Sequence, residues 1–272
     1  MIRGTRMRFG IALVAALATA GIAAGCGDDN GGGDLGLIKD GQLLAGIDTP
    51  FPPFEKGHPP NVTGYDIDVI NAIADEMGLE VVQQETAFET IFRDVAQGKF
   101  DVAVAASTIT PERERTVDFS DPYYLADQSL LVAEGSDIGS QEDLSGKIVG
   151  AQDGTTGETY ANDETDAAEV RGYPGGTDAI NALRTGQIDA VIVDSPVAED
   201  AVQKQGGLEI AEKIVTRELY GFSFAPDNDA LREAVNDALA TLKKDGTITE
   251  LYKKYFPGQS PKPVLEATNE PT

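Results

Sequence analysis

The spacing of apolar residues changes several times along the chain, and each change predicts a new element. Residues 43–47 form a short continuous apolar run, which indicates a buried strand. Over residues 67–77 the apolar positions recur at helical spacing, and Gly78 follows where the end of a helix favours glycine. A strand at residues 81–82 and a helix over residues 88–95 come next. This alternation predicts a parallel sheet of the βαβ type.

The second half of the chain repeats the alternation. The same pattern predicts strands at residues 129–133, 147–151 and 190–193 and helices at residues 177–185 and 230–242. We expect the last helix to finish in the apolar and aromatic residues Leu251, Tyr252, Tyr255 and Phe256, which should pack in the core. The chain passes between the two halves near residues 125–131 and again near residues 214–221, and two such passages form a hinge. We therefore predict an α/β protein with two lobes, in which two parallel-rich sheets are joined by a two-strand hinge. Ligands of open parallel sheets bind beyond the carboxyl ends of the strands.

Residues 101–124 combine a strand end with hydroxyl and charged side chains. A buried strand over residues 102–106 leads into a Ser/Thr-rich turn, in which Pro111 fits the first position of a helix and Thr110 is suited to cap it. Free N–H groups at a helix start attract an anion, and Arg113 adds a guanidinium that can hold a carboxylate through two parallel hydrogen bonds. These features predict a carboxylate clamp. The alternative is a surface ion pair of Arg113 with Glu112, Glu114 or Asp118.

Residues 107–113 (STITPER) and 118–124 (DFSDPYY) resemble the carboxylate-binding segment of the extracellular solute-binding proteins of family 3. Further matches extend from about residue 43 to residue 256. Proteins of this family serve amino-acid ABC importers, so the resemblance implies a periplasmic-binding-protein type II fold and a free amino acid as the ligand. It also implies transmembrane permease subunits as partners and no cofactor. Lobe 1 would hold residues 37–128 and 217–256, and lobe 2 residues 129–216.

The resemblance implies a ligand pocket on the facing rims of the lobes. Arg113 would hold the ligand carboxylate from one side, a Thr-Thr-Gly loop would hold it from the other, and Asp194 would receive the α-ammonium. Asp48 would reach polar ligand groups, and two aromatic rings would flank the ligand. The pocket residues are Asp48, Phe51, Phe88, Ala105, Ala106, Thr108, Arg113, Gln152, Thr155, Thr156, Gly157 and Asp194.

Some of these positions also have a purely structural explanation. Phe51 and Phe88 could pack in the core, as most aromatic residues do. Asp194 could cap a helix that begins at Pro196, and this role is compatible with ligand binding. Asp66 lies in a GYDID phrase that also matches the family. We expect Asp66 to cap the following helix, with ligand contact as a secondary role.

Residues 1–26 have the composition of a secretion signal. A head with three arginines precedes an uncharged run over residues 9–24, which ends in small residues before Cys26. The end of this run resembles a lipoprotein cleavage box, although Ala23 stands where the usual pattern has Leu, and it implies a diacylglyceryl anchor on Cys26. The alternative is an ordinary signal peptide with an accidental cysteine. Residues 27–36 are rich in Gly and Asp and indicate a flexible tether. We therefore expect an extracytoplasmic protein attached to the cell membrane.

An acidic excess narrows the range of partners. Removing the signal takes away three of the 21 basic residues and none of the 46 acidic ones, which leaves a net charge of −28. Nucleic acids and anionic membrane surfaces bind basic faces, so neither is predicted as a partner. The single cysteine excludes internal disulfides, and we expect a monomer. The Pro-rich, polar residues 257–272 are predicted to form a disordered tail.

No motif in the sequence predicts an enzyme. His58 is the only histidine, and no group of Cys, His and carboxylate residues has the spacing of a zinc or calcium site. A dehydratase of the same two-lobed fold, which works through carboxylates, stays open as an alternative. A sensor domain would need a transmembrane helix and a signalling domain after Phe256, and no such segment is recognised.

The predicted pocket favours a basic ligand. A cationic side chain could lie between Phe51 and Phe88 with Asp48 at its tip, whereas an acidic side chain would meet Asp48 without a partner. Gln152 stands where some glutamine-binding members carry Lys, which weakens a specific assignment to glutamine. We expect a basic amino acid first, an uncharged polar one second and an acidic one last.

Overall fold

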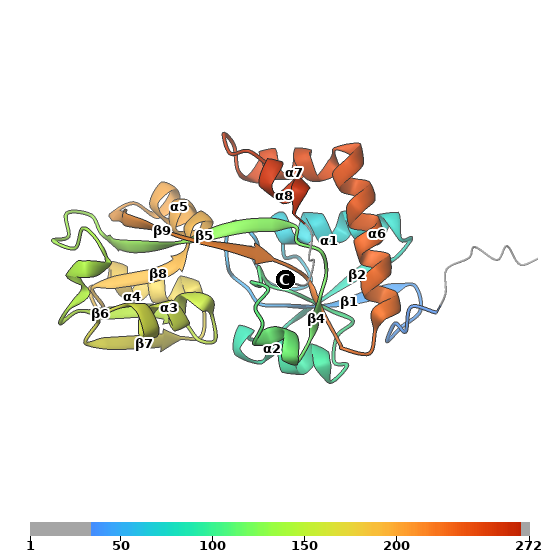
Figure 1. Cartoon of the computed structure of the whole chain (residues 1–272), viewed down its shortest axis with the longest axis horizontal. Helices are drawn as coiled ribbons and strands as arrows, with labels where there is room; N and C mark the ends of the chain where they lie inside the picture. The colour runs from blue at the N-terminus through green and yellow to red at the C-terminus, as the bar shows by residue number, and fades with distance from the viewer. Residues whose placement is uncertain (1–33, 268–272) are drawn as a thin grey trace, which may run out of the picture. The chain divides into compact units, whose positions relative to one another are not determined.

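The computed structural model describes residues 34–267. In this range the chain forms two lobes, each built on a five-stranded sheet with helices on both faces (Figure 1). The predicted two-lobed α/β architecture is confirmed. The predicted signal with Cys26, most of the tether and the last five residues of the tail lie outside the described residues.

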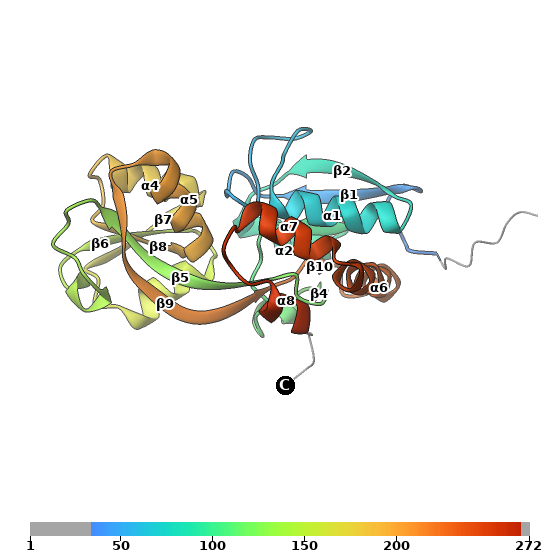
Figure 2. The same cartoon turned by 90° about the horizontal axis from the view of Figure 1, so that it is seen from above.

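Lobe 1 contains a sheet of strand order β2-β1-β3-β10-β4. Strands β2 (Glu80–Glu85) and β3 (Val102–Val104) pair parallel with β1 (Gln42–Ile47), and β10 (Ser223–Phe224) pairs antiparallel with β3 and β4 (Asp118–Phe119). One face is covered by α1 (Tyr65–Glu76), α6 (Asp229–Asp245) and α7 (Thr247–Tyr255), and the other by α2 (Phe88–Ala96) (Figures 1 and 2). Alternate residues of β3 face the two helical layers, which is why this strand is apolar throughout.

Lobe 2 contains a sheet of strand order β7-β6-β8-β5-β9. Its parallel part comprises β6 (Ile148–Gln152), β7 (Glu169–Tyr173) and β8 (Ala190–Asp194). The helix α3 (Thr156–Glu164) and the short 3₁₀ helix η2 (Gln141–Leu144) pack on one face, and α4 (Gly176–Arg184) and α5 (Ser195–Gln205) on the other. Ala190 and Ile192 of β8 face the α3 side, whereas Val191 and Val193 face the α4 side.

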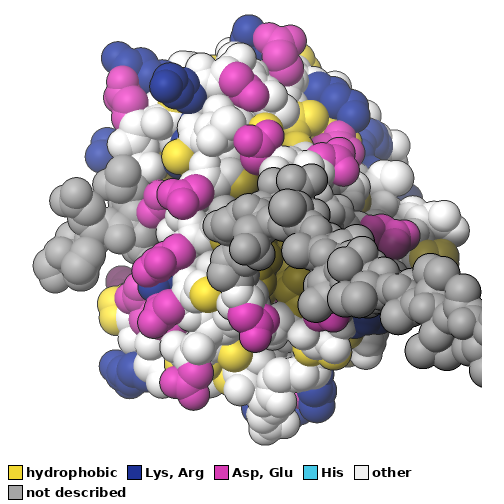
Figure 3. Space-filling model, turned by 90° about the vertical axis from the view of Figure 1, so that its right-hand side faces the viewer, with side chains coloured by type: hydrophobic (Ala, Val, Ile, Leu, Met, Phe, Trp, Pro, Cys, Tyr) yellow, Lys and Arg dark blue, Asp and Glu magenta, His cyan; other side chains and the backbone are white. Residues whose placement is uncertain are grey.

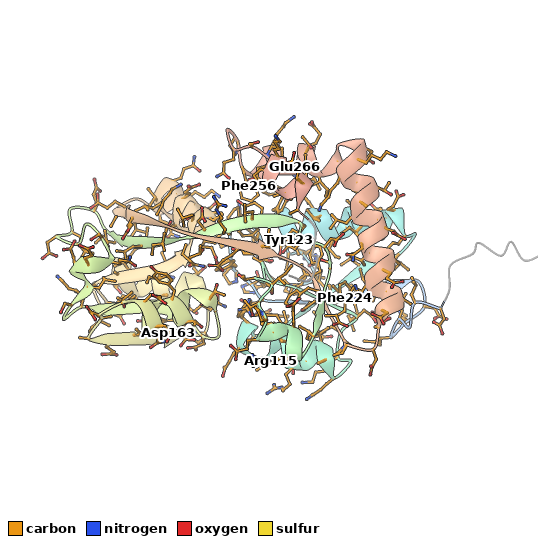
Figure 4. All side chains as sticks on the ribbon, in the orientation of Figure 1. Arg115, Tyr123, Asp163, Phe224, Phe256 and Glu266 are labelled. Atoms are coloured by element: carbon orange, nitrogen blue, oxygen red, sulfur yellow. The ribbon has the colours of Figure 1, made fainter. Side chains whose placement is uncertain are left out.

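Two long strands connect the lobes. Strands β5 (Tyr124–Ala133) and β9 (Leu208–Tyr220) pair antiparallel along their length and run from lobe 1 into the sheet of lobe 2 (Figure 2). Their pairing shifts register between Ala126 and Gln128, where β9 bulges. In lobe 1, Tyr124 is held by the rings of Phe54 at 5.0 Å and Phe256 at 4.7 Å. The labelled Phe256 lies on the lobe 1 side of these strands in Figure 4, so the C-terminal aromatic residues pack as predicted.

The structure corrects four details of the prediction. Each sheet is mixed, with two parallel and two antiparallel strand pairs, because the returning strands enter in the opposite direction. The segment at Pro111 forms a turn and a single 3₁₀ helix, η1 (Arg113–Arg115). The helix expected to continue to the C-terminal aromatic residues breaks at Gly246, whose φ of +97° is left-handed. Residues 257–267 of the predicted disordered tail contain α8 (Lys262–Glu266), which buries Val264 against lobe 1.

Charged side chains are distributed over the surface. On the uncovered part of the face shown in Figure 3, acidic and basic side chains are both present. Between residues 34 and 267, no helix has both the length and the apolar character that a membrane span requires.

Candidate functional site

The rims of the two lobes meet around a small cavity. Its volume is about 10 Å³. Eleven of the twelve predicted pocket residues line it: Asp48, Phe51, Phe88, Ala105, Ala106, Thr108, Arg113, Gln152, Thr155, Thr156 and Asp194. The strand ends of β1, β3, β6 and β8 bring these residues together, as expected for the carboxyl edges of parallel strands. Gly157 is not part of the lining.

A larger cavity of about 690 Å³ adjoins the same residues. It shares Thr108, Arg113, Thr155 and Thr156 with the small cavity and extends between the η1 turn and α3. Its outer part includes Glu112, Asp163 and Glu164. Figure 4 labels Asp163 on lobe 2 and Arg115, which lies in η1, on lobe 1. The cleft therefore opens to solvent past an acidic rim.

Arg113 is held in the cleft by backbone groups of both lobes. One terminal nitrogen donates to the carbonyl of Thr108 at 2.7 Å, and the other donates to the carbonyl of Gly154 in lobe 2 at 3.0 Å. Its guanidinium lies over the rings of Phe88 at 5.2 Å and Phe92 at 4.7 Å. Burial lowers the pKa of Arg113 to about 10, so the side chain is still a cation at neutral pH.

The surface ion pair considered for Arg113 is wrong, because none of the salt bridges in residues 34–267 involves it. The Thr110 hydroxyl does accept a hydrogen bond from the Arg113 N–H at 3.2 Å, as a cap would. However, the 3₁₀ turn that follows is too short to supply the helix dipole that the sequence suggested. The positive charge at this position therefore comes from the guanidinium.

Asp194 lies at the end of β8 and is buried. Its Oδ1 accepts a hydrogen bond from Gln128 Nε2 at 2.8 Å. Burial, reinforced by the neighbouring Glu218 carboxylate, raises the pKa of Asp194 to about 7. Asp194 occupies the N-cap position of α5, but its side chain makes no capping hydrogen bond, so the alternative of a capping side chain is wrong. The carboxylate faces the cavity instead.

Asp48 and Gln152 connect the two lobes. Gln152 Nε2 donates to Asp48 Oδ2 at 2.7 Å, and Gln152 Oε1 accepts from the Gly176 N–H at 3.2 Å. Burial raises the pKa of Asp48 to about 6, although the hydrogen bond from Gln152 lowers it. A second link lies nearby, where Thr177 Oγ1 donates to the carbonyl of Pro50 at 3.1 Å.

The two aromatic residues both line the cavity and belong to the core. Phe51 stacks on Phe54 at 6.3 Å and lies against Gly176 of lobe 2, where a Cβ would come within 2.9 Å of its ring. Phe88 packs edge-on against Phe92 at 5.6 Å. The two explanations weighed for these residues are therefore compatible.

Asp66 does not cap α1, and that expectation is wrong. Gly64 occupies the N-cap position, while Asp66 is fully buried within the first turn. Its Oδ2 accepts from the Ala106 N–H at 2.8 Å and from the Tyr123 hydroxyl at 2.6 Å. Ala106 has a left-handed φ of +43°, a strained value for alanine, so Asp66 supports the end of the strand that lines the cavity.

The Thr-Thr-Gly loop starts α3 at the edge of the cavity. Thr155 is the N-cap, and its hydroxyl accepts from the Glu158 N–H at 3.1 Å. A Cβ at Gly157 would lie 3.1 Å from both Gln128 Oε1 and the Ile192 carbonyl. Gly157 therefore allows α3 to pack closely on β8, which explains a glycine at a position that does not line the cavity.

Two residues that sequence reasoning missed come from the hinge strands. Gln128 of β5 donates to Asp194, and Glu218 of β9 accepts from Thr108 at 2.7 Å and from Thr156 at 2.5 Å. Both are buried polar side chains in strands. Gln128 lies between Asp127 and Ser129, just before the apolar run predicted as a strand, so the local sequence does not distinguish it from a loop residue. No cluster of three or more metal-ligating side chains occurs between residues 34 and 267.

The chain is similar to known amino-acid-binding proteins. The model of the bacterial extracellular solute-binding proteins, family 3, matches residues 43–258. The L-cystine-binding protein of Escherichia coli strain K12 is 32% identical over 229 residues, which cover 82% of this chain and 86% of that protein. The ABC transporter glutamine-binding protein of Bacillus subtilis strain 168 is 33% identical over 264 residues, which cover 91% of this chain and 96% of that protein.

A solved structure extends the similarity to the fold. An ancestral arginine-binding protein bound to arginine superposes with a TM-score of 0.75 at 38% identity, over 79% of this chain and 98% of that chain. The family match covers both lobes and the residues that line the cavity between them. The chain therefore belongs to family 3 of the bacterial extracellular solute-binding proteins.

Proposed function

We propose that this protein binds one free amino acid between its lobes outside the cytoplasm and delivers it to an ABC permease. The observation that carries the proposal is the meeting of Arg113 from lobe 1 and Asp194 from lobe 2 at one cavity. A zwitterionic amino acid presents a carboxylate to the first and an ammonium to the second. Because each lobe supplies one partner, ligand binding would favour approach of the lobes.

The lobes must separate to admit the ligand. A cavity of about 10 Å³ holds roughly one water molecule, which is far less than an amino acid requires. Separation would break several contacts between the lobes. They include the hydrogen bonds Gln152–Asp48 and Arg113–Gly154 and the ion pair between Lys56 and Asp200 at 3.8 Å. Bending at β5 and β9 would provide the motion.

A basic amino acid is the ligand class that the charges favour. Asp48, Asp194 and Glu218 are grouped around the cleft, while Arg113 is the one cation in the lining of the small cavity. A neutral zwitterion leaves the acidic excess uncompensated, whereas a cationic side chain offsets it. Asp48, beside the ring of Phe51, is the position for the tip of such a side chain. An uncharged polar ligand ranks second and an acidic one last.

A thermal-shift screen against the twenty amino acids tests the proposal. A ligand at one hundred times its Kd stabilises the folded protein by about 2.7 kcal/mol. We expect arginine or another basic amino acid to give the largest shift, and calorimetry with arginine, glutamine and glutamate then ranks the three classes. Tight binding of glutamate without binding of arginine would contradict the ligand class. A screen in which no amino acid stabilises the protein would contradict the function itself.

The membrane anchor and the partners complete the proposal. Its support is the basic head, the apolar run and the Gly/Asp-rich tether around Cys26 in the sequence. A lipid on Cys26 would keep a monomeric receptor near the transmembrane subunits of the permease. The acidic excess of the sequence gives no reason to expect a nucleic-acid partner.

A further inference from the structure

The hinge strand β9 contains an irregularity that directs one carboxylate into the cleft. Ala126 of β5 pairs with Glu218 and Gln128 pairs with Ile214, so three residues of β9 lie opposite Asp127 alone. The Asp127 carboxylate accepts from the N–H groups of Thr216 at 3.1 Å and Arg217 at 2.9 Å.

The backbone of this bulge is strained. Arg217 has a left-handed φ of +55°, which is unfavourable for a residue other than glycine. Val215 and Arg217 point outward, and Val215 is 73% exposed, whereas Glu218 is only 9% exposed. The bulge adds two residues to β9, so Glu218 keeps the inward face of Ile214 and lies opposite Ala126, where Thr216 would lie in a regular pairing.

The Glu218 carboxylate receives four hydrogen bonds. Its Oε2 accepts from the hydroxyl of Thr108 in lobe 1 at 2.7 Å and from that of Thr156 in lobe 2 at 2.5 Å. Its Oε1 accepts from Gln128 Nε2 at 2.9 Å and from the Thr216 hydroxyl at 2.8 Å. A carboxylate offers about four acceptor positions, so these donors satisfy it fully.

This arrangement determines what the two threonines can offer to a ligand. A hydroxyl has one hydrogen to donate, and both Thr108 and Thr156 donate theirs to Glu218. The hydroxyls can therefore act toward the cavity only as acceptors. Together with the Asp194 carboxylate they form an acceptor set, which suits an ammonium with its three donors. A ligand carboxylate would be left to Arg113 and backbone N–H groups.

We propose that Glu218 is a positioning residue of the binding site, which makes Thr108 and Thr156 acceptors for the ligand's α-ammonium. The inference rests on the proposed function, because it presumes an amino-acid ligand at this cavity. It revises the role of Thr156, which the family resemblance placed with the ligand carboxylate. In the revised role the hydroxyl faces the ammonium.

The test compares ligands that lack one half of the zwitterion. Wild type and Glu218→Gln of the full chain are titrated with arginine, with agmatine, which lacks the carboxylate, and with 5-guanidinopentanoate, which lacks the α-ammonium. We expect Glu218→Gln to lower the affinity for arginine and agmatine by roughly 10- to 100-fold and the affinity for 5-guanidinopentanoate by less than about threefold. If the wild type prefers glutamine, the matching pair is 4-aminobutanamide and 4-carbamoylbutanoate.

Two controls separate positioning from general damage. Glu209 lies in the same strand, and its carboxylate accepts a hydrogen bond from the exposed Gly135 N–H. The Glu209→Gln variant should therefore bind all three probes like the wild type. If Glu218→Gln does not fold, Thr156→Val, which removes the hydroxyl, should show the same selective loss, and Thr156→Ser, which keeps it, should not.

The outcomes are distinguishable. Equal losses for all three probes, or no loss for any of them, would overturn the role of Glu218 while the proposed function stands. A wild-type protein that binds none of the twenty amino acids would overturn the proposed function and this inference with it.

Discussion

Lowering the pH from 8 to 5 should weaken ligand binding, because Asp194 and Asp48 take up protons across this range. Burial raises the pKa of Asp194 to about 7 and that of Asp48 to about 6. A protonated Asp194 has lost the charge that would attract an ammonium. Conversely, an ammonium favours the ionised carboxylate, so binding at pH 6 should release close to one proton.

The pKa of Asp194 sets the size of the effect. If the ligand returns the pKa of this carboxyl to about 4, affinity falls about 80-fold between pH 8 and pH 5. The stability of the protein without ligand should change in the opposite direction. The pKa of Asp194 in the folded protein exceeds the ordinary value of 3.8. Protonated Asp194 therefore contributes to the free energy of unfolding fully below about pH 4, and this contribution is lost by about pH 7. Its size is on the order of 4 kcal/mol.

Calorimetry measures both quantities. Arginine is titrated at four pH values between 5 and 8, each in two buffers of different ionisation enthalpy, so that the number of released protons is counted directly. Thermal unfolding without ligand is followed over the same range. Asp194→Asn is the control, because it should bind weakly with little pH dependence above pH 6 and should unfold with a flatter pH profile than the wild type.

A contrary result would be clear. Affinity that stays constant or rises on acidification, with no proton released at pH 6, would show that Asp194 does not receive the ammonium. The same pH profile for the wild type and Asp194→Asn would assign the titration to another group.

Three further predictions concern single positions. Arg113→Ala should lose about 2–5 kcal/mol of binding free energy, roughly 30-fold or more in Kd, because a desolvated charge pair loses one partner. The exposed Arg115→Ala should bind normally in the same calorimetric assay, and normal binding by both variants would reject the clamp. Gly157→Ala should destabilise the fold by about 1–3 kcal/mol in denaturant titrations, because its Cβ would crowd Gln128 and Ile192. Gly139→Ala, whose Cβ meets only a side-chain oxygen at 3.6 Å, should change stability by less than about 0.5 kcal/mol, and equal effects would contradict this packing role. Cys26→Ser should move the protein from the membrane to the detergent-free soluble fraction or leave it as a precursor, and equal partitioning would exclude a lipid on Cys26.

The sequence by itself determined the alternation of strands and helices and the residues at the strand ends. Apolar periodicity is a local property, and it located β1, α1, α2 and β8 to within a few residues. The rule that parallel strands share one carboxyl edge then placed Asp48 and Thr108 on one rim and Asp194 at a strand end of the other lobe, whereas the family resemblance assigned Gln152 to the pocket. No knowledge of long-range contacts was needed for this step.

Elements with weak local signals were missed or misjudged. Strand β7 (EVRGY) lies at a sheet edge and is largely accessible, so it has no apolar run to reveal it. The short α8 (KPVLE) has only five residues, too few to show a helical period, and Val264 is its one buried residue. In both cases the order comes from packing against neighbours that are distant in the sequence.

Only the tertiary structure decided the functions of several polar residues. Asp66 has the composition and position of a helix cap, yet its partners are the Ala106 N–H and the Tyr123 hydroxyl, 40 and 57 residues away. In a regular pairing Thr216 would lie opposite Ala126, and the two extra residues of the bulge opposite Asp127 place Glu218 there instead. A hydrogen bond depends on distances between atoms that the local pattern does not encode. The sequence could therefore locate the rim of the site, while the direction of each polar side chain depended on the folded chain.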